Sequence, residues 1–223
     1  MLVERTVAGL HGALMRYLPL TLSHDCPILD IGCGTGAWLE RLADSGFTDL
    51  WGVDRDATHF GCERARFLKA DLDADRLEIG DTRFGLITAI EVIEHLENPG
   101  RLFSIVATFL DRHGYLLMTT PNIHSLLCRF RFCVTGHLKQ FDSKGDPTHI
   151  YPVLLESLKR VLPRYELEIA SQWWYPDDGS SITSRRSLKL VTAVLRILLP
   201  DDVPGDLLCL LIRRRVDQEL RGR

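Results

Sequence analysis

The chain has 223 residues, of which 45% are hydrophobic and 26% are charged, and its formal net charge is −3. This composition is typical of a globular protein and excludes collagen, coiled coils, disordered tails and disulfide scaffolds. Because proteins dedicated to holding nucleic-acid phosphates are usually basic, we expect no DNA partner, and the charge disfavours RNA.

Cysteine usage and the first residues bear on the cellular compartment. The six cysteines are scattered without a CxxC pair, which argues against a zinc ribbon and indicates free thiols in a reducing compartment. Glu4 and Arg5 stand where a signal peptide needs a basic start and then an unbroken apolar run. No stretch reaches the roughly 20 apolar residues that span a bilayer. We therefore expect a cytoplasmic protein without a transmembrane segment.

Strand and helix signals alternate through the first 120 residues. Short apolar runs predict strands at 27–31, 50–53, 66–70, 84–90 and 114–120. Apolar residues at helical spacing predict helices at 2–18, 37–45, 57–65 and 99–110. Because strands that alternate with helices usually pair in parallel, we expect a parallel sheet with helices on both faces.

The pattern changes after residue 120. A mixed segment at 121–150 is followed by a predicted helix at 153–162 and by two late strands at 165–174 and 206–213. The late strands are separated by a polar loop at 176–186 and an apolar helix at 188–199. No repeat or low-complexity tract is visible, which is consistent with one domain.

The most informative segment is ILDIGCGTGAWLERL, in which Asp30, Gly32, Gly34 and Gly36 form D-x-G-x-G-x-G between a strand and a helix. Glycines permit the turn and let backbone N–H groups approach a ligand, and the helix N-terminus favours an anionic group. A nicotinamide-type loop would read G-x-G-x-x-G, whereas here the third glycine comes one residue early. A tight turn without a ligand is the alternative, which the strand, the helix and the preceding Asp disfavour.

Two aspartates follow the next two predicted strands. Asp54 ends the strand in WGVD, and Asp71 follows the strand in FLKADLD. The carboxyl ends of strands face the ligand crevice in an open α/β sheet. Asp54 could therefore accept hydrogen bonds from both hydroxyls of a ribose, and Asp71 could accept one from an adenine amine. Each has a structural alternative, a helix N-cap for Asp54 and a turn residue for Asp71.

Taken as a set, the segments ILDIGCGTG, GVD, KADLD, FGLITAIEVIEHLENPGRL and GYLLMTTPN resemble the class I S-adenosylmethionine-dependent methyltransferases, in particular the ubiquinone- and menaquinone-biosynthesis-like group. The resemblance covers roughly residues 25–175. It implies an α/β fold with a doubly wound, seven-stranded, mostly parallel sheet and an antiparallel last strand, the Rossmann-like methyltransferase fold. It also implies a single methyltransferase domain over 1–223, with an N-terminal helix in 1–24, a cofactor-binding half at 25–120, and a substrate-side half at 121–223 that carries an insertion at 176–200.

The resemblance implies a site for the cofactor S-adenosylmethionine. Its glycine loop would hold the methionine end, Asp54 the ribose and Asp71 the adenine, and Glu91 would close the pocket beside the sulfonium. The residues implied to bind the cofactor are Asp30, Gly32, Cys33, Gly34, Gly36, Asp54, Arg55, Asp71, Leu72, Ile90 and Glu91.

Methyl transfer is an in-line displacement, so the protein has to align the acceptor and, for a hydroxyl, help to remove its proton. His95 in EVIEH and His149 in DPTHIYP fall near the segments expected to flank the methyl group, and histidine titrates near neutral pH. Both are catalytic candidates, and His149 is favoured because a loop position reaches a substrate more freely. The alternatives are a backbone-bonded helix-start residue for His95 and a surface residue for His149. The expected acceptor is a hydroxyl of a small molecule or a glycan.

A sharper alternative concerns Glu91, Glu94, His95 and His149. These residues resemble the metal tetrad of small-RNA 3′-terminal 2′-O-methyltransferases, since two carboxylates and two imidazoles suit Mg²⁺ or Mn²⁺. The EVIEH motif also occurs in methyltransferases without a metal, and the chain lacks a basic tract, so we expect no metal and disfavour RNA.

Two further functions remain open. A non-catalytic cofactor-binding subunit would keep the segment from Asp30 to Gly36 but would need no acceptor pocket. A dinucleotide oxidoreductase is a weaker candidate because of the glycine spacing.

Overall fold

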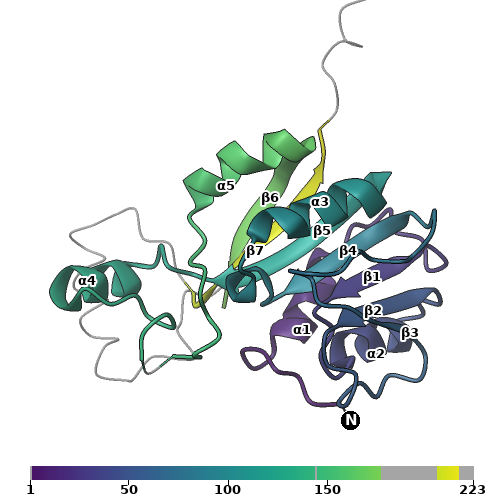
Figure 1. Cartoon of the computed structure of the whole chain (residues 1–223), viewed down its shortest axis with the longest axis horizontal. Helices are drawn as coiled ribbons and strands as arrows, with labels where there is room; N and C mark the ends of the chain where they lie inside the picture. Colours follow the sequence, from purple (N-terminus) through teal and green to yellow (C-terminus); the bar gives the residue numbers. More distant parts are fainter. Residues whose placement is uncertain (1, 144, 177–204, 216–223) are drawn as a thin grey trace, which may run out of the picture.

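A computed structural model describes residues 2–143, 145–176 and 205–215. These residues contain a seven-stranded sheet with the strand order β3-β2-β1-β4-β5-β7-β6 (Figure 1). The strands are β1 (Ile28–Ile31), β2 (Leu50–Asp54), β3 (Arg66–Lys69), β4 (Phe84–Ile90), β5 (Leu110–Pro121), β6 (Leu167–Tyr175) and β7 (Leu207–Arg214). The α-helices are α1 (Leu10–Leu14), α2 (Ala37–Asp44), α3 (Pro99–Phe109), α4 (Leu126–Thr135) and α5 (Leu155–Val161). Three 3₁₀ turns, η1 (Met15–Tyr17), η2 (Ile93–His95) and η3 (Leu162–Tyr165), complete the described elements.

Strand direction follows the expected pattern. Strands β1 to β5 pair in parallel, and β7 runs antiparallel to both of its neighbours, β5 and β6. It follows that β6 is parallel to β5 and that both end at the same edge of the sheet. The predicted mostly parallel sheet with an antiparallel last strand is therefore confirmed.

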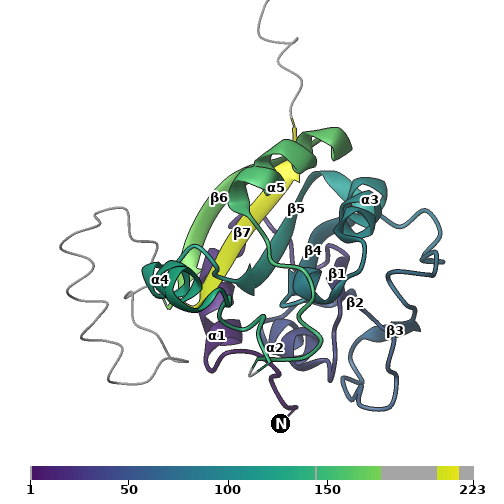
Figure 2. The same ribbon diagram turned by 60° about the vertical axis from the view of Figure 1, so that its left-hand side comes forward.

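Helices cover both faces of the sheet, so its central strands are buried on both sides. Helices α1 and α2 pack on one face through residues such as Leu10 and Trp38. Helices α3 and α5 pack on the other face through residues such as Phe103 and Leu158. Figure 2 shows the two layers on opposite sides of the strands. All four residues of β1 are buried, and three of them are apolar, with Asp30 as the exception.

Two predicted helices differ from the structure, and one helix was not predicted. The helix expected at 2–18 is helical only at 10–17, because Gly9, with φ of +79°, begins α1 in a left-handed conformation. The helix expected at 57–65 is absent, because the Asp56 carboxylate accepts hydrogen bonds from both the N–H and the hydroxyl of Thr58 and so forms a turn. In the mixed segment, Ser125 caps an unexpected helix, α4.

Three predictions, a loop, a helix and an insertion, fall on the part of the chain that the structure leaves undescribed. The polar loop at 176–186, the helix at 188–199 and the insertion at 176–200 lie there, apart from Pro176. Among the described residues, no helix has both the length and the apolar character needed to cross a bilayer.

Candidate cofactor and active site

The glycine loop follows β1 and is open at its middle. Gly32, Gly34 and Gly36 all have positive φ angles, of 71°, 51° and 81°. A Cβ atom on Gly32 would lie 2.5 Å from Val92 Cγ2, and one on Gly36 would lie 2.7 Å from Cys62 Cβ. A Cβ atom on Gly34 would meet nothing within 4 Å. The outer glycines therefore allow close packing, whereas Gly34 faces space that a ligand can use.

Asp54 stands at the end of β2 and is oriented by the glycine loop. One carboxylate oxygen accepts the Gly34 N–H at 2.8 Å, and the other accepts the Asp56 N–H at 2.9 Å. These bonds hold the half-buried carboxylate beside the open part of the loop, where the sequence predicts a ribose. The next residue, Arg55, is exposed, and its charge helps to lower the pKa of His95.

Asp30 is the buried acid at the start of the loop. The Thr88 hydroxyl on β4 donates to its Oδ1 at 2.6 Å. Burial raises the pKa of Asp30 to about 7, the hydrogen bond from Thr88 opposes that shift, and the charge of Asp54 adds to it. An ammonium group bound beside Asp30 would favour the ionised carboxylate, which suits the predicted contact with the methionine end.

Asp71 and Leu72 form a fixed turn after β3. The Asp71 carboxylate accepts the Asp73 N–H at 2.9 Å, and its own N–H donates to Asp75 at 2.8 Å. Leu72 is buried, and its carbonyl accepts a hydrogen bond from Arg101 Nε at 2.7 Å. Arg101, which the sequence analysis did not single out, thus supports the turn from α3.

The end of β4 is held in an uncommon conformation. Ile90 is buried. The next residue, Glu91, has a backbone φ angle of 56°, a conformation that residues other than glycine seldom adopt. Thr119 on β5 stabilises it, because its Oγ1 accepts the Glu91 N–H at 3.1 Å while its hydroxyl lies 3.1 Å from the Glu91 carboxylate. Burial raises the pKa of Glu91 to about 7. Such conformations concentrate at functional sites, which fits the predicted position beside the reacting group.

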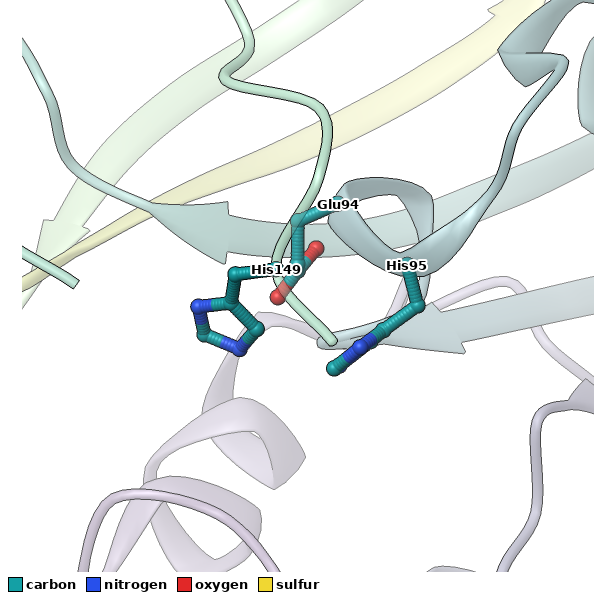
Figure 3. Close-up of side chains that lie close together, drawn as sticks. All are labelled: Glu94, His95 and His149. Atoms are coloured by element: carbon teal, nitrogen blue, oxygen red, sulfur yellow. The ribbon is translucent and has the colours of Figure 1, made fainter. Parts of the chain in front are cut away.

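Glu94, His95 and His149 come together next to this strand end. Each offers a ligand atom, and these atoms all lie within 4.8 Å of one another. The two imidazole rings are 4.7 Å apart between centroids. Figure 3 shows Glu94 and His95 on the turn after β4 and His149 on a separate segment. The sequence analysis named both histidines, and the structure brings them together.

Glu94 is the unusual member of this cluster. It has no exposed surface, and neither carboxylate oxygen has a hydrogen bond of normal geometry, although the Thr120 hydroxyl lies near enough to oppose the rise in its pKa. Burial raises its pKa well above the ordinary value, and the nearby charge of Glu91 raises it further. A buried carboxylate without a donor is costly unless it is protonated or bound to a cation. The cluster therefore has the composition of a divalent-cation site, which the sequence analysis had set aside.

The backbone fixes the ring orientation of both histidines. His149 Nδ1 lies 3.1 Å from the Gln140 carbonyl, and His95 Nδ1 lies 3.1 Å from the Thr148 carbonyl. Because a carbonyl can only accept, both contacts are hydrogen bonds in the tautomer with the proton on Nδ1, which leaves the lone pair of the neutral ring on Nε2. The Thr148 hydroxyl, 2.8 Å from His95 Nδ1, can accept in the same tautomer because it also donates to Asp146. The pKa of His95 is lowered by burial and then by the charge of His149. Both rings can therefore accept a proton or bind a metal through Nε2.

A backbone clamp ties the His149 segment to the turn after β4. The Glu94 carbonyl accepts the N–H groups of Ile150 and Tyr151, each at 2.9 Å. Sequence reasoning could not detect this clamp, because backbone groups leave no signature in residue types.

Comparison with known proteins agrees with this geometry. A family model described as a methyltransferase domain matches residues 6–191. The ubiquinone biosynthesis O-methyltransferase of Photobacterium profundum is 26% identical over 130 residues, which make up 55% of this chain and 55% of that protein. The protein of the same name from Burkholderia orbicola is 26% identical over 163 residues, or 66% of this chain and 68% of that protein. This chain thus spans about half the length of the first relative.

Solved structures share the fold. A SAM-dependent methyltransferase from Archaeoglobus fulgidus has a TM-score of 0.61 at 23% identity and covers 94% of this chain and 95% of its own. One from Mesorhizobium loti has a TM-score of 0.59 at 18% identity and covers 91% of this chain and 96% of its own. The open glycine loop and the oriented Asp54 carboxylate fit a ligand with a ribose. The chain belongs to the methyltransferase domain family, and its cofactor is S-adenosylmethionine.

Proposed function

We propose that the protein transfers the methyl group of S-adenosylmethionine to a hydroxyl oxygen of a small molecule or sugar. The observation that carries the proposal is the His95–His149 pair, in which each Nδ1 faces a loop carbonyl. An oxygen acceptor needs a base, because the pKa of a hydroxyl lies far above neutral. The name of the relatives, ubiquinone biosynthesis O-methyltransferase, also describes transfer to oxygen by those proteins.

The cofactor supplies an activated methyl group on a sulfonium, so the protein itself positions the groups and moves one proton. Asp54 and the Gly34 loop hold the cofactor, and Glu91 closes the pocket at the end of β4. His149 Nε2 takes the proton from the acceptor hydroxyl as the oxygen–carbon bond forms, and later gives it to water. Alignment by these fixed segments supplies much of the rate enhancement, and the base adds about 10²–10⁴-fold.

A second candidate function is favoured by the Glu94–His95–His149 cluster. A divalent cation held by these residues would bind an acceptor with two neighbouring oxygens and lower the pKa of the hydroxyl that is methylated. The buried Glu94 carboxylate, whose oxygens have no hydrogen bond of normal geometry, supports this candidate. In that case the two histidines serve as ligands rather than as bases.

One set of assays tests the function. The purified protein is incubated with radiolabelled S-adenosylmethionine and a panel of phenols, catechols and sugars, and label transfer and S-adenosylhomocysteine are measured. We expect label on an oxygen of at least one acceptor. No turnover with any member of the panel, despite tight cofactor binding, would instead favour a non-catalytic binding subunit.

Glu94→Gln distinguishes the two candidates. Burial and the charge of Glu91 raise the pKa of Glu94 and so favour its neutral form in the absence of a cation. Under base catalysis, an amide of the same shape should therefore leave turnover unchanged. Cation-assisted transfer would be lost in Glu94→Gln, and EDTA would abolish turnover of the native protein until Mg²⁺ or Mn²⁺ is restored. Glu78→Gln, on the exposed surface, is the matched control.

A further inference from the structure

Residues 2–9, here named the N-terminal strap, precede α1 and have no regular secondary structure. Both views show this segment passing beside α2 before α1 begins (Figures 1 and 2). Its first anchor is the glycine loop. The hydroxyl of Thr35, which lies between Gly34 and Gly36, donates to the Val3 carbonyl at 2.8 Å. The strap is thus bonded directly to the loop that holds the cofactor.

The second anchor is at the far side of the sheet. The Tyr175 hydroxyl, at the end of β6, donates to the Ala8 carbonyl at 2.7 Å. The phenol lies so close to the chain that a Cβ on Gly9 would be 2.8 Å from its oxygen. The strap therefore ends in close contact with Tyr175, at a position, Gly9, where a larger residue would collide with the phenol oxygen.

These anchors place the strap along the edge of the sheet that binds ligands. Since β6 is parallel to β5, Tyr175 lies at the same carboxyl edge as the glycine loop after β1. The strand order puts β4, β5 and β7 between β1 and β6. A segment held at both ends thus bridges the cofactor half and the last strands, along the edge where β4 ends at Glu91.

Two side-chain contacts reinforce the strap near its start. Glu4 forms an ion pair with Arg41 of α2 at 2.6 Å. Leu2 packs against the turn after β2, where a Cβ on Gly61 would lie 2.9 Å from its Cδ2. The Gly61 N–H in turn donates to the Thr35 carbonyl at 3.1 Å. The strap is therefore packed on both segments that flank Asp54.

We propose that the strap is a gate over the cofactor site, which swings open to admit S-adenosylmethionine and to release S-adenosylhomocysteine. The hydrogen bonds that hold the strap closed, from Thr35 and Tyr175, are made within the protein and do not involve the ligand. Weakening them therefore eases opening equally for entry and for exit, and the equilibrium affinity changes little.

Stopped-flow binding of S-adenosylhomocysteine, followed by tryptophan fluorescence, tests the gate. Thr35→Val and Tyr175→Phe each remove one hydrogen bond, so each should raise both the association and the dissociation rate constant about fivefold. The two anchors lie at opposite ends of the strap, so the double variant should show about the product, on the order of 25-fold. Thr108→Val removes a similar hydroxyl–carbonyl bond within α3 and should leave both rates unchanged.

Two results would overturn the gate. If only the dissociation rate constant rises, the strap is a fixed part of the binding site that contacts the ligand, and it is not a gate. If neither rate changes while the melting temperature falls, the strap serves folding alone. Tyr175→Phe keeps the test valid even where Thr35→Val disturbs the glycine loop itself.

Discussion

His95 and His149 lie with ring centroids 4.7 Å apart, one on the turn after β4 and the other on the segment before α5. Their Nδ1 atoms both face backbone carbonyls of residues 140–148, so the two Nε2 atoms are left to act together. One ring can accept a proton while the other orients the acceptor. Under the proposed transfer to oxygen, the site would thus be assembled from two distant segments of the chain.

Replacing His149 with Ala should lower kcat by about 10²–10⁴-fold, the usual contribution of a general base. Cofactor affinity should stay nearly constant, because the ring makes no bond to the glycine loop or to Asp54. Steady-state kinetics and calorimetric titration with S-adenosylhomocysteine measure the two quantities, with the exposed His113→Ala as control. If His149→Ala and His95→Ala both retain nearly native kcat between about pH 6 and 9, neither histidine is the base.

Asp54→Ala should weaken cofactor binding by about 1–3 kcal/mol, because a charge-assisted acceptor is lost. The effect includes release of the Gly34 N–H, which the Asp54 carboxylate now holds. Isothermal titration measures the change. Asp111→Ala, which removes a comparable carboxylate-to-N–H bond at the opposite edge of the sheet, is the control and should bind normally. Native affinity in Asp54→Ala would remove this carboxylate from the site.

Gly34→Ala and Gly36→Ala should separate binding from folding. The new methyl group at Gly34 enters open space, so stability should fall only by the roughly 1–2 kcal/mol of a left-handed backbone while cofactor binding is blocked. At Gly36 the methyl group collides with Cys62 and Phe60, so the fold itself should be destabilised. Thermal unfolding without ligand distinguishes them, and equal melting temperatures would contradict the assigned roles.

Asp30 should make the ligand-free protein less stable as pH rises. Its pKa is raised from 3.8 to about 7 by burial, so between these values the folded protein retains a proton that the unfolded chain releases. The free energy of unfolding therefore falls as pH rises through this window. Asp30→Asn keeps the acceptor for Thr88 without the titration.

The melting temperature of Asp30→Asn minus that of the native protein should accordingly be larger at pH 8 than at pH 5, because only the native protein loses stability as Asp30 ionises. Differential scanning calorimetry without cofactor measures it. A difference that is the same at both pH values would show that Asp30 titrates normally in the folded protein. With cofactor added, the variant should bind more weakly, because a neutral amide attracts an ammonium less than a carboxylate does.

The cofactor half could be predicted from the sequence because its signals are local. Strand β1, the glycine loop and α2 follow one another within residues 28–44. The apolar run, the glycines of the turn and the helical spacing of apolar residues therefore all predict the same strand–loop–helix unit. The strands β2 and β4 were placed to within one residue for the same reason.

Other features depend on contacts between distant residues. The apolar spacing at 57–65 favours a helix, but Asp56 binds Thr58 and Phe60 packs towards Gly36, so the chain turns instead. The amphipathic pattern of residues 2–18 predicts a helix through the strap, whereas hydrogen bonds to the Val3 and Ala8 carbonyls from distant residues hold the strap in an irregular conformation. The juxtaposition of Glu94 with both histidines likewise arises from the tertiary fold.

The Glu94 carbonyl, which receives the N–H groups of Ile150 and Tyr151, has a consequence for protein engineering. Both partners are main-chain groups, so the joint is indifferent to the side chains on either segment. The part of the segment after β5 that precedes Gln140 can then be exchanged for one of different length or polarity, while Gln140, Thr148 and the joint keep the two imidazole rings in place. A chimera that carries a different segment here but retains this joint should keep the arrangement of its histidines while changing the molecule that it methylates.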